Sequence, residues 1–219
     1  MKIKAFGCSF IWGTDLSDAK FPLGSYHTWP ALIARARALD YKNCAIGGIG
    51  NTQIAAMIAT ELGEDDNADS IYVIQWTWAD RFDYIDNEQM WQTLRPSLEM
   101  AHAENYYRNL HSDFLDRFTS LQNIAATVAL LNRHDQKFIM TALDTSLRDP
   151  VSADYFHPAI LDSYWNMVCS YLHWFQDLDF LSWSRKHGFA ESKLCHPLED
   201  AHVGAAQLML PALDVMLHS

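Results

Sequence analysis

The chain has 219 residues, a length that accommodates one domain with a full hydrophobic core and is short for two. Its formal net charge of -11, with no basic stripe to offset it, disfavours binding to nucleic acid or to an anionic membrane surface. Apolar residues make up 49% and charged residues 20%, which is the balance of a folded globular protein and excludes a disordered or fibrous one. We therefore expect a single domain over residues 1–219.

The sequence also predicts where the protein works. No run approaches the ~20 apolar residues that a bilayer span needs, and residues 1–7 lead directly into a core strand, so we expect no membrane anchor and no signal peptide. The four cysteines are far apart and form no CxxC pair, which predicts neither a disulfide framework nor a zinc site; they are Cys8, Cys44, Cys169 and Cys195. We expect a cytoplasmic protein.

Strand-like and helix-like segments alternate along the chain. Strands are expected at residues 2–6, 41–46, 70–76, 137–143 and 180–183, and helices at 28–39, 51–62, 114–132, 158–175 and from 205 onward. Thr28 is the expected N-cap of the first helix, and Asn51 or Thr52 that of the second. This alternation is typical of a parallel sheet that is covered by helices on both faces.

Residues 77–112 depart from the alternation and are predicted to be an aromatic-rich insertion. Its aromatic side chains, with the residue before it, are Trp76, Trp78, Phe82, Tyr84, Trp91, Tyr106 and Tyr107. They could form a lid or a stacking platform for a sugar or acyl group, but we favour a small core of the insertion itself. Arg81 either binds a carboxylate or sugar hydroxyl of a ligand, or pairs with Asp80 or Asp83.

The first chemical signal follows the first strand, in Gly7-Cys8-Ser9-Phe10. In an open parallel sheet, ligands bind beyond the carboxyl ends of the strands, so Ser9 can face a substrate while a following helix offers backbone N–H groups to an oxyanion. Alternatively, Ser9 caps a turn. Cys8 is a second possible nucleophile, although a cysteine at the end of a buried strand is usually a small core residue.

The second signal is the glycine-rich stretch 47–50, followed by Asn51. The glycines let backbone amides approach a ligand, and the Asn51 side chain adds an amide donor. Gly48-Ile49-Gly50 begins a GxGxxG pattern, but Gln53 stands at the third glycine and the stretch follows the second strand, which argues against a dinucleotide loop. A purely structural turn also remains open.

The third signal lies near the end of the chain, in His196-Pro197 and Ala201-His202. A histidine ahead of the last helix can meet Ser9 across the carboxyl edge of the sheet and act as its general base. Because the chain has ten histidines, an incidental histidine in a surface loop is the alternative.

Taken together, the three stretches resemble the SGNH (GDSL-like) hydrolase family, in the same order along the chain. The family carries its nucleophile in a Gly-x-Ser sequence, a glycine amide donor in Asn-x-Gly/Ala-x-x-Gly, and its base in a form close to His-Pro-x-x-x-Gly-His. The matching residues are Gly7 and Ser9, then Asn43, Ala45 and Gly48, then His196, Pro197 and His202, with Ala201 in place of the last glycine. The resemblance implies a flavodoxin-like three-layer α/β/α sandwich with a mostly parallel five-stranded sheet.

The chain departs from the family at two places. The family has Gly-x-Asn-Asp after the third strand, where this chain has Gln75-Trp76-Thr77-Trp78, so Thr77 or Asn51 would replace the oxyanion asparagine. Loss of one such donor typically costs ~3 kcal/mol of transition-state stabilisation. Lys193 stands where the family has its acid. This leaves open whether Glu191, Glu199, Asp200 or a backbone carbonyl orients the histidine, or whether Asp200 and His202 form the acid and base.

The resemblance implies a serine esterase for small acyl or acetyl esters, including acetylated sugars, with Ser9 as nucleophile and His196 as base. The backbone amides of Ser9 and Gly48, with Asn51 or Thr77, would hold the oxyanion, and we expect no metal and no cofactor. The alternative from another class is a non-catalytic binding module on a degenerate SGNH scaffold. A flavodoxin-like nucleotide binder, a third possibility, would be purified with bound cofactor.

Overall fold

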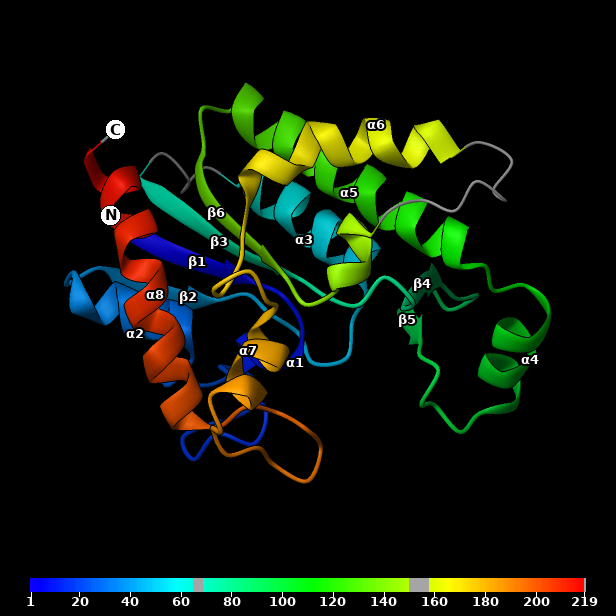
Figure 1. Ribbon diagram of the computed structural model, residues 1–219, viewed down its shortest axis with the longest axis horizontal. Coiled ribbons are helices and arrows are strands. Elements are labelled where there is room, and N and C mark those ends of the chain that lie inside the picture. The colour runs from blue at the N-terminus through cyan, green and yellow to red at the C-terminus, as the bar shows by residue number, and fades with distance from the viewer. Residues whose placement is uncertain (65–68, 150–157, 219) are drawn as a thin grey trace.

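The computed structural model describes residues 1–64, 69–149 and 158–218, and its centre is one five-stranded parallel sheet (Figure 1). The strands are β1 (Lys2–Phe6), β2 (Asp40–Asn43), β3 (Ser70–Trp76), β6 (Lys137–Ala142) and β7 (Leu172–His173), in the order β2-β1-β3-β6-β7. Every neighbouring pair is parallel, as in the pairing of Ala5 with Asn43 on one side and with Val73 on the other. The mostly parallel five-stranded sheet that the resemblance implied is confirmed.

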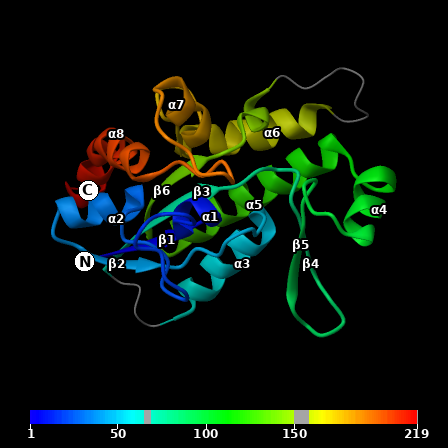
Figure 2. The same cartoon turned by 90° about the horizontal axis from the view of Figure 1, so that it is seen from below.

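Helices cover both faces of the sheet, as Figures 1 and 2 show. One face packs against α2 (Trp29–Ala36), α7 (Phe180–Lys186) and α8 (Glu199–His218), and the other against α3 (Asn51–Leu62), α5 (Asp113–Arg133) and α6 (Pro158–Val168). All residues of β3 are buried, as expected for a strand between two helical layers. The result is the three-layer α/β/α sandwich that the resemblance implied.

The turn after β1 places Ser9 at the carboxyl edge of the sheet. Ser9 is the first residue of the short helix α1 (Ser9–Trp12). At Gly7 a Cβ atom would lie 2.7 Å from Cγ1 of Ile11 and 3.0 Å from the carbonyl oxygen of Gln75, so no other residue fits there without displacing its neighbours. The glycine of the Gly-x-Ser sequence is therefore required by the sharp change from strand to helix.

The amino terminus of α3 is capped from outside the helix, and the expected cap at Asn51 or Thr52 is wrong. Gly50 is the N-cap residue, and the carboxylate of Asp83 accepts the N–H groups of Gly50 and Gln53, each at 2.8 Å. A Cβ atom on Gly50 would lie 2.6 Å from Oδ2 of Asp83, so the glycine permits this approach. Helix α2 does begin after Thr28, as predicted, and ends at Ala36, before the expected Leu39.

The segment 77–112 forms a hairpin and a helix that project beyond the carboxyl edge of the sheet (Figure 2). The hairpin pairs β4 (Phe82–Ile85) with β5 (Trp91–Leu94), and α4 (Ala101–Asn109) follows. Leu94, Ala103 and Tyr106 form a separate small core against which Tyr84 and Tyr107 pack, which agrees with the favoured interpretation for three of the seven aromatics. Trp76, by contrast, is fully buried in the main core.

Two elements in the last third of the chain differ from the predictions. The helix expected over 158–175 ends at Val168; the short 3-10 helix η2 (Cys169–Tyr171) and strand β7 follow. The strand expected at 180–183 is wrong, because these residues belong to α7, whose N-cap Asp179 accepts the N–H of Ser182 at 2.9 Å. A short apolar run does not distinguish a buried strand from a buried helix, so the cap decides.

The remaining differences concern the start of the last helix and the residues after β6. Helix α8 begins at Glu199, earlier than expected, and β6 is followed by a 3-10 helix, η1 (Thr145–Arg148). Within the described residues, no helix combines the length and the apolar character needed to cross a bilayer.

Asp83→Ala removes the acceptor of the two N–H groups at the start of α3 and of the Thr93 hydroxyl, which Asp83 accepts at 2.6 Å. We expect the free energy of unfolding to fall by about 1–2 kcal/mol, as for the loss of a strong helix cap. Urea titration followed by circular dichroism measures this loss. Glu88→Ala, at an exposed position of the same hairpin, is the matched control. Equal stability of the two variants would contradict the capping role.

Candidate active site

Three side chains form a continuous hydrogen-bonded chain at the carboxyl edge of the sheet. Nε2 of His196 lies 3.0 Å from Oγ of Ser9, and Nδ1 of His196 lies 2.7 Å from Oδ2 of Asp15. Ser9 begins α1, Asp15 lies in the loop after it, and His196 lies in the loop before α8. The structure thus brings together the serine and histidine singled out in the sequence, and it adds a carboxylate.

Ser192 organises the loop that carries the histidine. Its hydroxyl donates to Oδ2 of Asp15 at 2.7 Å and accepts the N–H groups of Leu194 and His196 at 3.1 and 3.3 Å. The ring of Phe10 packs edge-on against the imidazole of His196, with 5.4 Å between the ring centroids. The imidazole is therefore held by a hydrogen bond on each nitrogen and by an aromatic contact on one side.

The charge of Asp15 sets the roles of the two imidazole nitrogens. Hydrogen bonds from Ser192 and then from His196 lower the pKa of Asp15 below its ordinary value, so this carboxylate is ionised at neutral pH. An ionised carboxylate accepts the proton on Nδ1, which leaves Nε2 of the neutral imidazole as an acceptor for the Ser9 hydroxyl. This is the arrangement that general-base activation of a hydroxyl requires.

Asp15 was not among the carboxylates that the sequence suggested for this position. Both carboxylate oxygens of Glu191 bind Arg185, Glu199 accepts the N–H of Ser17, and Asp200 is exposed on the first turn of α8. Asp15 lies only six residues after Ser9, but its contact with His196 joins positions 181 residues apart. The sequence did indicate that the histidine needs a carboxylate from another part of the chain, because Lys193 stands where the family has its acid.

His202 has a structural role in α2, so the alternative pairing of Asp200 with His202 is wrong. Its side chain is buried, and Nδ1 accepts the N–H of Trp29, the first residue of α2, at 3.1 Å. Burial lowers the pKa of His202 to about 3, so the ring stays neutral in the folded protein. His196, and not His202, contacts Ser9.

Two of the four expected oxyanion donors, Asn51 and Thr77, are not among the residues that line the cavity at Ser9. The Asn51 amide group donates to the carbonyl of Thr77 at 3.2 Å and to the Ser120 hydroxyl at 3.0 Å, while its oxygen accepts the N–H of Thr77. Thr77 has no exposed surface and does not line the cavity at Ser9. The Asn51 side chain therefore joins the start of α3 to the residue that follows β3, because it both donates to and accepts from the backbone of Thr77.

Of the other two expected donors, one is the backbone N–H of the serine itself, and the other belongs to a loop that lies beside it. The N–H of Ser9 is at the first position of α1, where a helix leaves backbone donors without an intrahelical acceptor. Gly47 and Gly48 belong to one loop beside it, since a Cβ atom on Gly47 would lie 4.0 Å from that of Ser9.

A cavity of about 550 Å³ opens at Ser9 and His196. Its wall comes from helix α1, residues after β3, residues after β5, helix α7 and the loop before His196; it comprises Phe10, Trp78, Asp80, Arg81, Arg95, Pro96, Ser97, Leu181, Leu194 and Cys195. Trp78 thus differs from the other aromatics of the insertion in reaching the cavity. Arg81 lies here without an ion pair to Asp80 or Asp83 among the described contacts, and Cys8 is fully buried, as a core residue would be.

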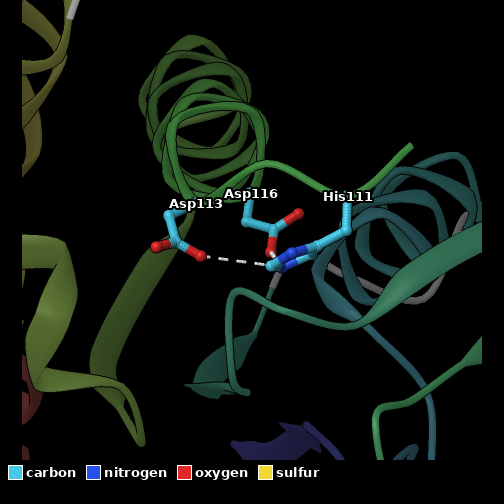
Figure 3. A group of neighbouring side chains, drawn as sticks. All are labelled: His111, Asp113 and Asp116. Atoms are coloured by element: carbon cyan, nitrogen blue, oxygen red, sulfur yellow. Dashed lines mark hydrogen bonds and ion pairs between the residues drawn. The ribbon is translucent and has the colours of Figure 1, made fainter. Parts of the chain in front are cut away.

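Among the described residues, one group offers several atoms of the kind that bind a metal ion: His111, Asp113 and Asp116, shown in Figure 3. Nε2 of His111 lies 2.7 Å from Oδ2 of Asp116 and 3.7 Å from Oδ1 of Asp113. The shorter distance is that of a direct hydrogen bond. Burial raises the pKa of Asp116 to about 6. His111 lies between α4 and α5, and both aspartates lie in the first turn of α5, so we interpret the group as a contact that stabilises the junction of these two helices.

No family profile and no characterised protein matches this chain by sequence, whereas solved structures do match its fold. TesA has a TM-score of 0.54 and 14% identity, over 99% of each chain. A carbohydrate esterase family 2 enzyme with a carbohydrate-binding domain, from Corynascus thermopiles (Myceliophthora fergusii), has a TM-score of 0.57 and 15% identity over 100% of this chain and 67% of its own. The esterase EstA from Pseudoalteromonas sp. has a TM-score of 0.51 and 12% identity, over 100% of this chain and 99% of its own. The chain has the SGNH hydrolase fold of these structures.

The buried imidazole of His202 makes the stability of the protein depend on pH. Its pKa falls from 6.5 to about 3 on folding, so below pH 6.5 the unfolded chain binds a proton that the folded protein does not. Stability is therefore lost as the pH falls, by up to ~1.4 kcal/mol per pH unit from this group. His202→Asn keeps an acceptor oxygen for Trp29 and cannot titrate, so its unfolding free energy should fall less steeply between pH 6.5 and 4.

Urea titration at several pH values measures these slopes. His134→Asn, which replaces an exposed histidine, should keep the slope of the unmodified protein. An unchanged slope in His202→Asn would contradict the assignment of a neutral, buried imidazole.

Proposed function

We propose that the protein is a serine hydrolase that cleaves small acyl or acetyl esters through Ser9, His196 and Asp15. The observation that carries the proposal is the hydrogen-bonded chain from Oγ of Ser9 through the imidazole to Asp15, at 3.0 and 2.7 Å. The fold shared with several esterases supports it, as does the cavity that opens at the serine.

The reaction follows from these contacts. Nε2 of His196 takes the Ser9 proton while Oγ attacks the ester carbonyl carbon, and Asp15 stabilises the imidazolium that results. The imidazolium then protonates the departing alcohol, which leaves an acyl group on Ser9. A water molecule, deprotonated by His196, attacks this acyl group, and collapse of the second tetrahedral intermediate releases the acid and restores the serine. No step uses a cofactor.

The backbone N–H groups of Ser9 and Gly48 are the proposed oxyanion donors. Amide donors held by the backbone need no reorganisation as the negative charge develops on the carbonyl oxygen. Asn51 contributes indirectly, because its amide holds the end of β3 against the start of α3. In this proposal the family's asparagine has no direct counterpart among the side chains that line the cavity.

The alternative of a non-catalytic binding module rested on two departures from the family, the missing acid and the missing oxyanion asparagine. Asp15 removes the first of these, because its carboxylate occupies the place on Nδ1 that an orienting acid takes. A binding module has no need for an imidazole held at hydrogen-bond distance from both a serine hydroxyl and a carboxylate. We therefore favour the hydrolase.

Labelling with a fluorophosphonate probe tests the nucleophile. We expect one label per chain, abolished in Ser9→Ala, because Oγ would attack phosphorus as it attacks a carbonyl carbon. The structure of EstA inhibited by monoethylphosphonate supports this choice of reagent for the fold. Intact-protein mass spectrometry measures the label. A folded protein that takes up no label would contradict the proposal.

Replacement of the carboxylates tests the acid. Asp15→Asn should lower kcat by about 10²- to 10⁴-fold, because an amide in place of the carboxylate favours the wrong imidazole tautomer. Asp200→Asn, the matched control on the exposed first turn of α8, should keep the kcat of the unmodified protein. Steady-state assays with para-nitrophenyl acetate measure both. A larger loss in Asp200→Asn than in Asp15→Asn would overturn the assignment.

A further inference from the structure

Two guanidinium groups face the cavity at Ser9, in a protein whose formal net charge is -11. Arg81 follows β3 and Arg95 follows β5, so both belong to the segment 77–112. In the part of the chain that the structure describes, the arginines with ion pairs are Arg37, Arg108 and Arg185. Arg81 and Arg95, the two arginines at the cavity, form no ion pair with a carboxylate among the described residues.

Arg81 is held in place by contacts that leave most of its donors free. Its Nη1 donates to the carbonyl of Ile49 at 2.8 Å, and its Cζ lies 4.8 Å from the centroid of the Trp78 ring. A guanidinium has five N–H donors in a rigid planar fork, so one backbone acceptor and one aromatic face leave a pre-oriented group. Arg81 is therefore positioned at the cavity before any ligand binds.

Arg95 lies over the loop beside the nucleophile. A Cβ atom on Gly48 would lie 3.4 Å from Nη1 of Arg95 and 3.8 Å from its Cζ. Gly47, the preceding residue of that loop, lies next to Ser9. A Cβ atom on Gly47 would lie 4.0 Å from the Cβ atom of Ser9. The guanidinium of Arg95 thus lies against the loop that flanks Ser9, and it belongs to a different segment from Ser9 and His196.

Asp80 is the acidic residue in the wall of the cavity. Burial, and then the nearby charge of Asp144, raise its pKa above the ordinary value, while Arg81 and His111 act in the opposite direction. The residues that line the cavity carry two guanidinium groups against one carboxylate, which gives the wall itself a net positive charge. A positive cavity in an acidic protein favours an anionic ligand over a neutral one.

We infer that this cavity binds esters whose non-reacting part carries a carboxylate, and that Arg95 and Arg81 determine this specificity. The inference rests on the proposed hydrolase function and adds its substrate class. Guanidinium groups bind carboxylates through paired charge-assisted hydrogen bonds, and a cavity of about 550 Å³ is large enough for a small aromatic or sugar acid.

The test compares two acetate esters of the same shape, para-acetoxybenzoate and para-acetoxybenzamide, which differ in a carboxylate against a carboxamide. We expect kcat/KM to be about tenfold or more higher for the anionic ester, as charge-assisted hydrogen bonds predict. Arg95→Gln should reduce this preference by raising KM for the anionic ester, and Arg95→Lys should restore part of it. Arg108→Gln, which removes an equal charge from α4 in the same segment, should keep the preference.

The inference is overturned if, in the unmodified protein, the ratio of kcat/KM for the anionic ester to kcat/KM for the neutral ester is one or less. Equal losses of kcat for both esters in Arg95→Gln also overturn it, because they would assign Arg95 to the oxyanion and not to the substrate's carboxylate. Preservation of the preference in Arg95→Gln, together with its loss in Arg108→Gln, would likewise contradict the assignment.

A binding measurement separates this inference from the proposed function. Titration of Ser9→Ala with para-hydroxybenzoate, followed by tryptophan fluorescence, should show binding that Arg95→Gln in the same background weakens about tenfold. If Ser9→Ala binds para-hydroxybenzoate but the unmodified protein hydrolyses no ester, the anion site is retained and the hydrolase is rejected. Hydrolysis of esters by the unmodified protein, without binding of this anion to Ser9→Ala, would retain the hydrolase and reject the anion site.

Discussion

The candidate site depends on hydrogen bonds between two loops from opposite ends of the chain. Asp15 binds both His196 and Ser192, and the N–H of Ser17 binds the carboxylate of Glu199. These contacts hold the loop after α1 against the loop before α8, above the carboxyl edge of the sheet. Because the groups are partly exposed, their contribution to stability is small; their effect is to orient the imidazole toward Ser9.

The segment 77–112 both supports the scaffold and shapes the site. Asp83 takes the backbone donors at the start of α3, the position at which a phosphate would bind in a dinucleotide fold. An internal carboxylate there explains the glycine at position 50 without any nucleotide. The same segment contributes Trp78, Arg81 and Arg95 to the cavity wall, so the stability of the hairpin and the shape of the cavity are coupled.

Local patterns predicted the elements whose pattern is long and regular. The strand at 70–76 and the helices around it were found because a buried parallel strand is almost continuously apolar and a surface helix repeats every 3.6 residues. Short elements were not found in the same way. Strand β7 has two residues, and the apolar residues of α7 resemble a strand until the cap at Asp179 is considered.

The sequence by itself determined the parallel sheet and the position of Ser9, because a residue just after a parallel strand lies at the carboxyl edge of the sheet. His196 was singled out by the resemblance of the His196-Pro197 stretch to the family. Only the tertiary structure decided that Asp15 is the carboxylate, that His202 is structural and that Arg95 reaches the cavity. Those contacts depend on loop conformations, such as the left-handed backbone at Asp15 and Cys195, which no local periodicity encodes.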